Sequence, residues 1–198
     1  MRIRVSHLAV VFSCLAVVAT LHADWTGVAA TAAIDEGDLG KVVFNSDGSA
    51  EIRPTISSTS AKLRLTVPET ERLRVPKPRP DEVGNLVFAM RVRDNGAAAR
   101  VIATLKRVSV GYFIDRPRTD VAATIDSDLF APGDGWMTAW ANPNQLYSSC
   151  CWIRNPNTGT REGLDFFDVG YFVEVQLIKN SAEGNPGVMS VAILRDQP

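Results

Sequence analysis

Hydrophobic and polar residues alternate with a period of two in several short segments of the chain. The clearest case is 60–67, where apolar residues occupy the odd positions and polar residues the even ones. Such alternation is typical of a strand with one buried face and one wet face. In 171–178 the same period recurs with apolar residues on both faces, which predicts a strand in the middle of a sheet.

Turn residues separate these segments at short intervals. Asn-Ser-Asp-Gly at 45–48 lies between 42–44 and 50–53, and Asp94-Asn95-Gly96 lies between 86–93 and 100–110. Asp, Asn and Gly tolerate the backbone angles of tight turns, so both sites predict hairpins. Further strands are expected at 121–125, 136–140 and 188–194, and no segment beyond residue 23 has a convincing helical period. The pattern predicts an all-β fold: a single antiparallel β-sandwich over 41–198, jelly-roll or immunoglobulin-like, preceded by an arm or linker at 24–40.

The first 23 residues have the features of a secretory signal peptide. Arg2 and Arg4 precede an apolar run at 8–21, and Ala23 is a small residue before the cut expected ahead of Asp24. The run fits the core of a signal peptide and is shorter than the ~20 residues needed to span a bilayer. We therefore expect a secreted or extracytoplasmic protein whose mature chain has no transmembrane segment.

Charge and histidine content restrict the chemistry of the mature chain. The formal net charge is −1, and loss of Arg2 and Arg4 would make it −3, so no basic field points to nucleic acid. Both histidines, His7 and His22, lie in the predicted leader. Without imidazole, catalytic triads and histidine metal sites are excluded, and we expect no enzyme activity. The one catalytic alternative is carboxylate-dependent glycoside hydrolysis, for which Asp165, Asp168 and Glu174 are the nearest candidates.

Cys150 and Cys151 are neighbours and are the only cysteines left after the predicted cleavage. Three states are open: two thiols on opposite faces of a strand, a vicinal disulfide, or a bridge to another molecule.

Two carboxylates in one predicted loop region, Asp126 and Asp128, form a candidate calcium site, because calcium prefers oxygen ligands from loops. The alternative is that these side chains accept hydrogen bonds from their own backbone, as Asp in turns usually does. No other cofactor is expected.

Large aromatic residues gather between 136 and 152. Trp136 and Trp140 belong to a strand that resembles a core strand, so burial is expected for both. Tyr147 and Trp152 lie in a stretch that also contains Asn142 and Asn144. Exposed rings can stack on sugars while amides bond the hydroxyls, so these four residues are the candidate ligand-binding set.

The sequence thus predicts a secreted, non-catalytic recognition module that contacts a glycan or another surface protein through the end loops at 142–162. The alternatives are a structural or protein-interaction surface protein and, third, the carboxylate-dependent hydrolase.

Overall fold

The computed structural model describes residues 22–70, 73, 86–109, 118–141, 151–154, 159, 161–166 and 169–195, the side chains of 22–24 and 161–162 excepted. In this part of the chain the strands form two larger sheets and one small one, and all their pairings are antiparallel. The fold is the β-sandwich that the sequence predicts. Among the described residues, none of the helical segments has the length and apolarity that a membrane crossing requires.

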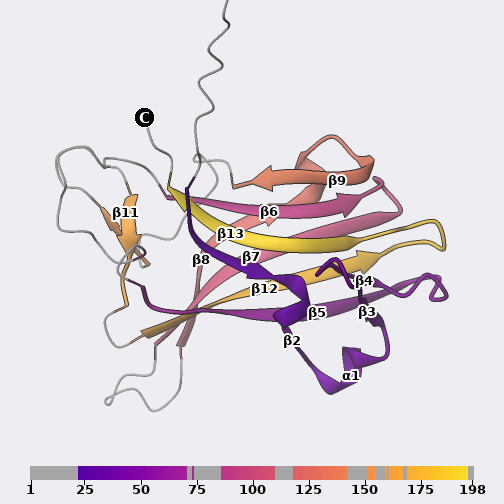
Figure 1. Cartoon of the computed structure of the whole chain (residues 1–198), viewed down its shortest axis with the longest axis horizontal. Helices are drawn as coiled ribbons and strands as arrows, with labels where there is room; N and C mark the ends of the chain where they lie inside the picture. The colour runs from indigo at the N-terminus through magenta and orange to yellow at the C-terminus, as the bar shows by residue number, and fades with distance from the viewer. Residues whose placement is uncertain are drawn as a thin grey trace, which may run out of the picture.

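Sheet A has six strands and lies in front in Figure 1. Its order is β3 (Val42–Phe44), β4 (Ala50–Ile52), β13 (Gly187–Arg195), β6 (Leu86–Asp94) and β9 (Gly133–Trp140), and β1 (His22–Val28) also pairs with β13. The residues at 24–40, predicted as an arm or linker, therefore contribute a strand to the sandwich. After β1 come the short helices η1 (Ala29–Thr31) and α1 (Glu36–Leu39).

Sheet B lies behind sheet A (Figure 1). Its order is β2 (Ala33–Ile34), β5 (Thr59–Val67), β12 (Val169–Lys179), β7 (Ala99–Ser109) and β8 (Arg118–Asp126). Helix η2 (Ser127–Leu129) follows β8, and the small third sheet pairs β10 (Trp152–Arg154) with β11 (Arg161–Leu164).

The core lies between the facing sides of sheets A and B. Strand β5 confirms the alternation read from the sequence, because Leu63 and Leu65 are buried while Lys62 and Arg64 are exposed. From sheet A, Phe88, Met90 and Ile193 enter the same core at 1% exposure or less. Burial of the apolar side chains of this core supplies most of the driving force that keeps the two sheets together.

One predicted connection is wrong. The turn at Asp94–Gly96 forms with Gly96 at φ +88°, as its residues suggest. However, β6 pairs with β13 and β9 in sheet A, whereas β7 pairs with β12 and β8 in sheet B. The turn therefore crosses from one sheet to the other instead of closing a hairpin. The hairpin of β3 and β4 is confirmed, with Gly48 at φ +87° in its turn.

Candidate functional site

Strand β9 turns its large side chains away from the core. Met137 and Ala139 pack inward, so the alternate residues Trp136, Thr138 and Trp140 lie on the outer face of sheet A. Trp140 is 54% exposed, and Trp136 is half-buried. The expectation that both rings belong to the core is wrong, because the smaller residues of this strand face the opposite sheet.

Small side chains surround Trp140 on the same face. In register, Trp140 lies opposite Ala89 of β6, and Ala89 lies opposite Ala192 of β13. The ring of Phe130 meets Trp140 edge-on, with 6.4 Å between centroids and 74° between planes. This edge contact holds the indole in place while more than half of its surface stays open.

The next row of the face is polar. Thr138 of β9 lies opposite Arg91 of β6, and Arg91 lies opposite Ser190 of β13. Both Thr138 and Arg91 are exposed. The row offers two hydroxyls and a guanidinium, all able to donate hydrogen bonds to a ligand.

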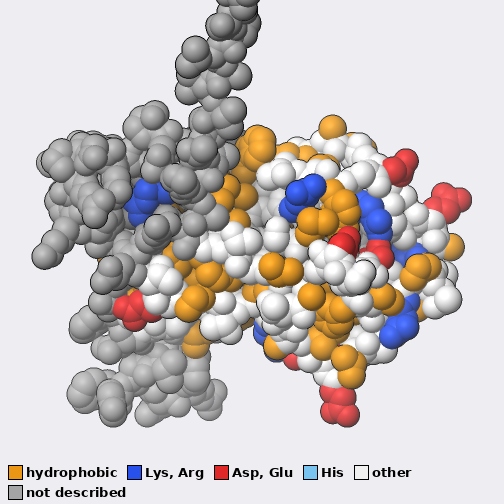
Figure 2. Space-filling model, viewed as in Figure 1, with side chains coloured by type: hydrophobic (Ala, Val, Ile, Leu, Met, Phe, Trp, Pro, Cys, Tyr) orange, Lys and Arg blue, Asp and Glu red, His pale blue; other side chains and the backbone are white. Residues whose placement is uncertain are grey.

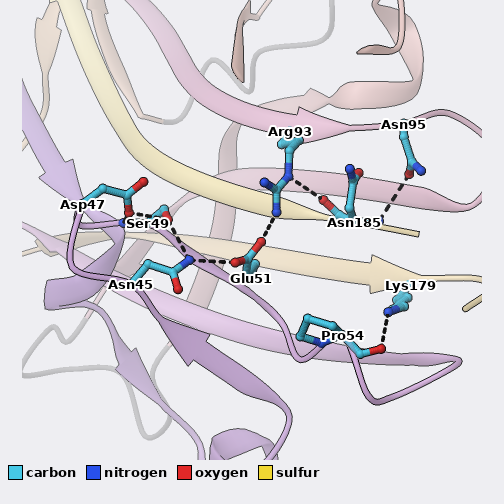
Figure 3. Close-up of polar contacts among 9 residues, drawn as sticks. All are labelled: Asn45, Asp47, Ser49, Glu51, Pro54, Arg93, Asn95, Lys179 and Asn185. Carbon is cyan, nitrogen blue, oxygen red and sulfur yellow. Dashed lines mark hydrogen bonds and ion pairs between the residues drawn. The ribbon is translucent and has the colours of Figure 1, made fainter. Parts of the chain in front are cut away.

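Arg93 occupies the third row, where its guanidinium carbon lies 5.3 Å from the centroid of the Trp136 ring. The same guanidinium forms an ion pair with Glu51 of β4, and its Nε donates to the carbonyl oxygen of Asn185 at 3.3 Å (Figure 3). Glu51 also accepts a hydrogen bond from Nδ2 of Asn45 at 2.7 Å. These contacts fix the arginine and, through the cation–π contact, the Trp136 ring beneath it.

We call this surface the tryptophan face, and it consists of Ala89, Arg91, Arg93, Trp136, Thr138, Trp140, Ser190 and Ala192. On the side shown in Figure 2, cationic side chains lie between hydrophobic ones over the area where Figure 1 places β6 and β9. Extended strands rise about 3.4 Å per residue, so Trp136 and Trp140 stand about 14 Å apart along β9.

The predicted ligand-binding set does not form this surface. Asn142, Asn144 and Tyr147 lie outside the described residues. Trp152 is 6% exposed, and its Nε1 donates to the carbonyl oxygen of Ala122 at 3.3 Å. The prediction of Trp152 as an exposed stacking ring is therefore wrong.

Cys151 is fully buried and disulfide-bonded. Its partner is one of the two other cysteines of the chain, Cys14 and Cys150, and both lie outside the described residues. The interpretation of Cys151 as a free thiol is wrong, while its pairing with Cys150 stays a prediction.

The candidate calcium ligands Asp126 and Asp128 lie at the start of η2 and share one cation. Both oxygens of Asp126 accept from Arg100, and Asp128 lies 3.1 Å from the same guanidinium. The hydrogen bond with Asp126 is the main reason that the pKa of Arg100 is raised. Burial raises the pKa of the Asp128 carboxyl although Arg100 acts against it.

Asp126 also caps η2, since its Oδ1 accepts from the backbone nitrogen of Asp128 at 3.2 Å. Within the described ranges, no group of three or more residues of metal-binding type gathers at one point. Calcium at this pair stays a prediction, and an ion there would compete with Arg100 for the same oxygens.

The acidic candidates for hydrolysis occupy different surroundings. Glu174 lies on the outer face of sheet B among three cations, with Lys106 at 2.8 Å, Lys62 at 3.5 Å and Arg64 at 3.6 Å. Burial alone would raise the pKa of Glu174, but the hydrogen bond from Lys106 and the three positive charges lower it overall. A carboxyl held ionised in this way is a poor general acid.

Asp165, the second acidic candidate, follows β11, and its backbone oxygen lies 2.7 Å from the hydroxyl of Tyr171. Its carboxylate lies 3.8 Å from Arg107. Asp168 is outside the described residues.

The sequence matches no protein-family model and no curated protein. The solved structures that align with this chain include two carbohydrate-related proteins. A family 30 carbohydrate-binding module aligns with 90% of this chain and 85% of its own at 12% identity and a TM-score of 0.41. A family two carbohydrate esterase from Cellvibrio japonicus aligns with 87% of this chain at 9% identity and a TM-score of 0.36, and only 34% of the esterase chain is covered.

Proposed function

We propose that this chain is a non-catalytic recognition module that binds a glycan across the tryptophan face. The observation that carries the proposal is the 54% exposed ring of Trp140 on the same sheet face as Trp136. Apolar surface that gathers on one face and is rimmed by polar residues is typical of an interaction site, and an exposed indole offers a large flat contact. The apolar faces of sugar rings offer such a contact.

The polar rows of the face suit the rest of a sugar. Thr138 presents a hydroxyl between the rings on β9, Ser190 presents another two strands away on β13, and the planar guanidinium of Arg91 lies between these two strands. The two indoles are separated by about 14 Å along the strand, which favours an extended ligand of several sugar units over a single monosaccharide.

The binding surface proposed here differs from the end loops that the sequence favours. It lies on strands, and strands hold side chains more rigidly than loops do. The runner-up function is protein interaction, which is favoured by Leu129, 60% exposed and one residue before Phe130.

Retention on immobilised polysaccharides tests the proposal. We expect the wild-type chain to be retained by at least one member of a broad panel and Trp140→Ala to weaken retention about tenfold or more, as for a central aromatic contact. Val121→Ala is the matched control, because Val121 is 44% exposed but lies on β8 of sheet B.

Absence of retention on the whole panel would overturn the proposal. Self-association by light scattering that Trp140→Ala abolishes would instead support the protein-interaction function. Circular dichroism of each variant tests whether its fold is intact.

A further inference from the structure

Arg91 is an exposed cation in the middle of the tryptophan face. Its position opposite Thr138 puts it halfway between Trp136 and Trp140 along the strands. Within the part of the chain that the structure describes, it has no ion pair and no side-chain hydrogen bond. A ligand that lies along β9 and touches both indoles crosses Thr138 and has the Arg91 guanidinium beside it on the next strand.

The charges around Arg91 leave it uncompensated. Arg93 lies two residues along the same strand on the same face, and the carboxylate of Glu51 is already paired with Arg93. Another exposed carboxylate of β9, that of Asp134, follows Gly133, which lies opposite Asp94, three residues along β6 from Arg91. Three residues of strand span about 10 Å, which exceeds the screening length of ~8 Å in physiological salt.

Sheet B shows the opposite arrangement. Arg64 is paired with Asp35 at 2.8 Å, and Lys106 is paired with Glu174 at the same distance. Arg100 is paired with Asp126 and Asp128. On that outer face each of these cations has its anion within the chain, whereas no carboxylate of the described residues pairs with Arg91 on the tryptophan face.

We propose that the ligand of the tryptophan face is an acidic polysaccharide whose carboxylate or sulfate group binds the guanidinium of Arg91 while one of its sugar rings stacks on Trp140 and a further unit contacts the half-buried Trp136, whose ring Arg93 covers. This inference rests on the proposed function and names its ligand class. The planar guanidinium donates two parallel hydrogen bonds to such a group, which fixes its position on the face.

Matched polysaccharide pairs test the ligand class. Polygalacturonate and its methyl-esterified form differ in the free carboxylate, and κ-carrageenan and desulfated κ-carrageenan differ in the sulfate ester. We expect the wild-type chain to bind the acidic member of at least one pair and to bind the neutral member about tenfold or more weakly. Sodium chloride should weaken this binding.

The variant Arg91→Gln should lose the preference for the acidic polymer, and Arg91→Lys should keep part of it, since lysine retains the charge without the planar donors. Arg154→Gln is the matched control, because Arg154 is an exposed arginine on β10, outside sheets A and B. It should bind like wild type.

The failures are distinguishable. If wild type and Arg91→Gln bind neutral and acidic polymers alike while Trp140→Ala binds neither, the charge inference falls and the glycan-binding proposal stands. If the wild-type chain binds none of the polymers in this set or in the broad panel, both fall. Thermal unfolding of each variant tests whether a loss of binding arises at the surface or from a loss of folding.

Discussion

Tyr171 joins three segments through one hydroxyl. The side chain is 3% exposed, and its oxygen lies 2.8 Å from the carbonyl oxygen of Cys151 and 2.7 Å from that of Asp165. Phe166 packs edge-on against its ring, with 4.9 Å between the centroids. We expect Tyr171→Phe to lower the free energy of unfolding by about 1–2 kcal/mol, because it leaves buried carbonyl oxygens without their donor. Urea denaturation at pH 7 measures the difference.

The same residue gives the stability a pH dependence. Burial raises the pKa of Tyr171 to about 12, whereas a tyrosine in the unfolded chain titrates near 10. The folded state therefore keeps the proton longer, so this contribution is full below pH 10 and is lost as the pH rises toward 12. Tyr171→Phe should unfold with a shallower loss of stability over that interval. Equal pH slopes for the two proteins would contradict the assignment.

Residue orientation is where prediction from the sequence fails. The period of a strand puts Trp136, Thr138 and Trp140 on one side, but it does not say which side of the strand faces the partner sheet. In β9 the rule that large rings lie inside gives the wrong face, because Ala139 fits the core and Trp140 does not enter it. For Trp152 the error is the opposite one, because the ring is predicted to be exposed and is buried. Its burial depends on contacts with β8, which is distant in the sequence.

At the scale of elements, the turns at one end of the sandwich are joined by hydrogen bonds. The backbone nitrogen of Asn180 donates to the carbonyl oxygen of Ala98 at 2.9 Å, and Nδ2 of Asn95 donates to that of Glu183 at 2.8 Å. The buried Lys179 adds a link to the carbonyl oxygen of Pro54 at 3.3 Å (Figure 3). The β6–β7 turn and the β12–β13 loop are therefore one packed unit.

Gly184 is the position where this unit has no spare room. A Cβ atom there would overlap the carbonyl oxygen of Ala98 and lie 2.9 Å from its carbonyl carbon. We expect Gly184→Ala to destabilise the fold by about 2 kcal/mol or more, because the obstacle is backbone and cannot rotate away. Gly37→Ala is the matched control, since a Cβ atom at Gly37 would meet nothing within 4 Å. A thermal unfolding midpoint of Gly184→Ala equal to that of the control would contradict the prediction.

These contacts explain which elements can be read from the sequence. The β3–β4 hairpin is predictable because turn and strands lie within eleven residues. The turn at Asp94–Gly96 is predictable for the same local reason, but the partners of β6 and β7 are not. The choice of partner depends on β13 for β6 and on β12 for β7. These strands come up to about a hundred residues later in the chain, so the sequence around the turn carries no signal for the pairing.

At the scale of the molecule, the two outer faces have different chemistry. Sheet B covers its outer face with cross-strand ion pairs, centred on Glu174 of β12 between β5 and β7. Sheet A presents indoles, small side chains and an arginine that lacks a partner among the described residues. The ion pairs of sheet B contribute to stability, and the proposed binding surface lies on sheet A, so changes on the two faces should separate stability from recognition.

Glu174→Gln tests that separation. The pKa of Glu174 is lower in the folded protein than in the unfolded chain. Its ion pairs therefore stabilise the fold fully at a pH above the unfolded-state pKa of Glu174, and this stabilisation is lost as the pH falls through the folded-state pKa. We expect the variant to be about 1 kcal/mol less stable than wild type at pH 7, as for partly exposed pairs, and to approach wild type in acid, where both side chains are neutral. Urea titrations between pH 7 and pH 2 measure this. Glu183→Gln is the control, because Glu183 is exposed on the β12–β13 loop, away from these cations.

Retention of Glu174→Gln on any polysaccharide that binds wild type should be unchanged at pH 7, since the proposed binding surface lies on the other sheet. A loss of retention without unfolding would place the ligand on sheet B and contradict the tryptophan face as the binding surface.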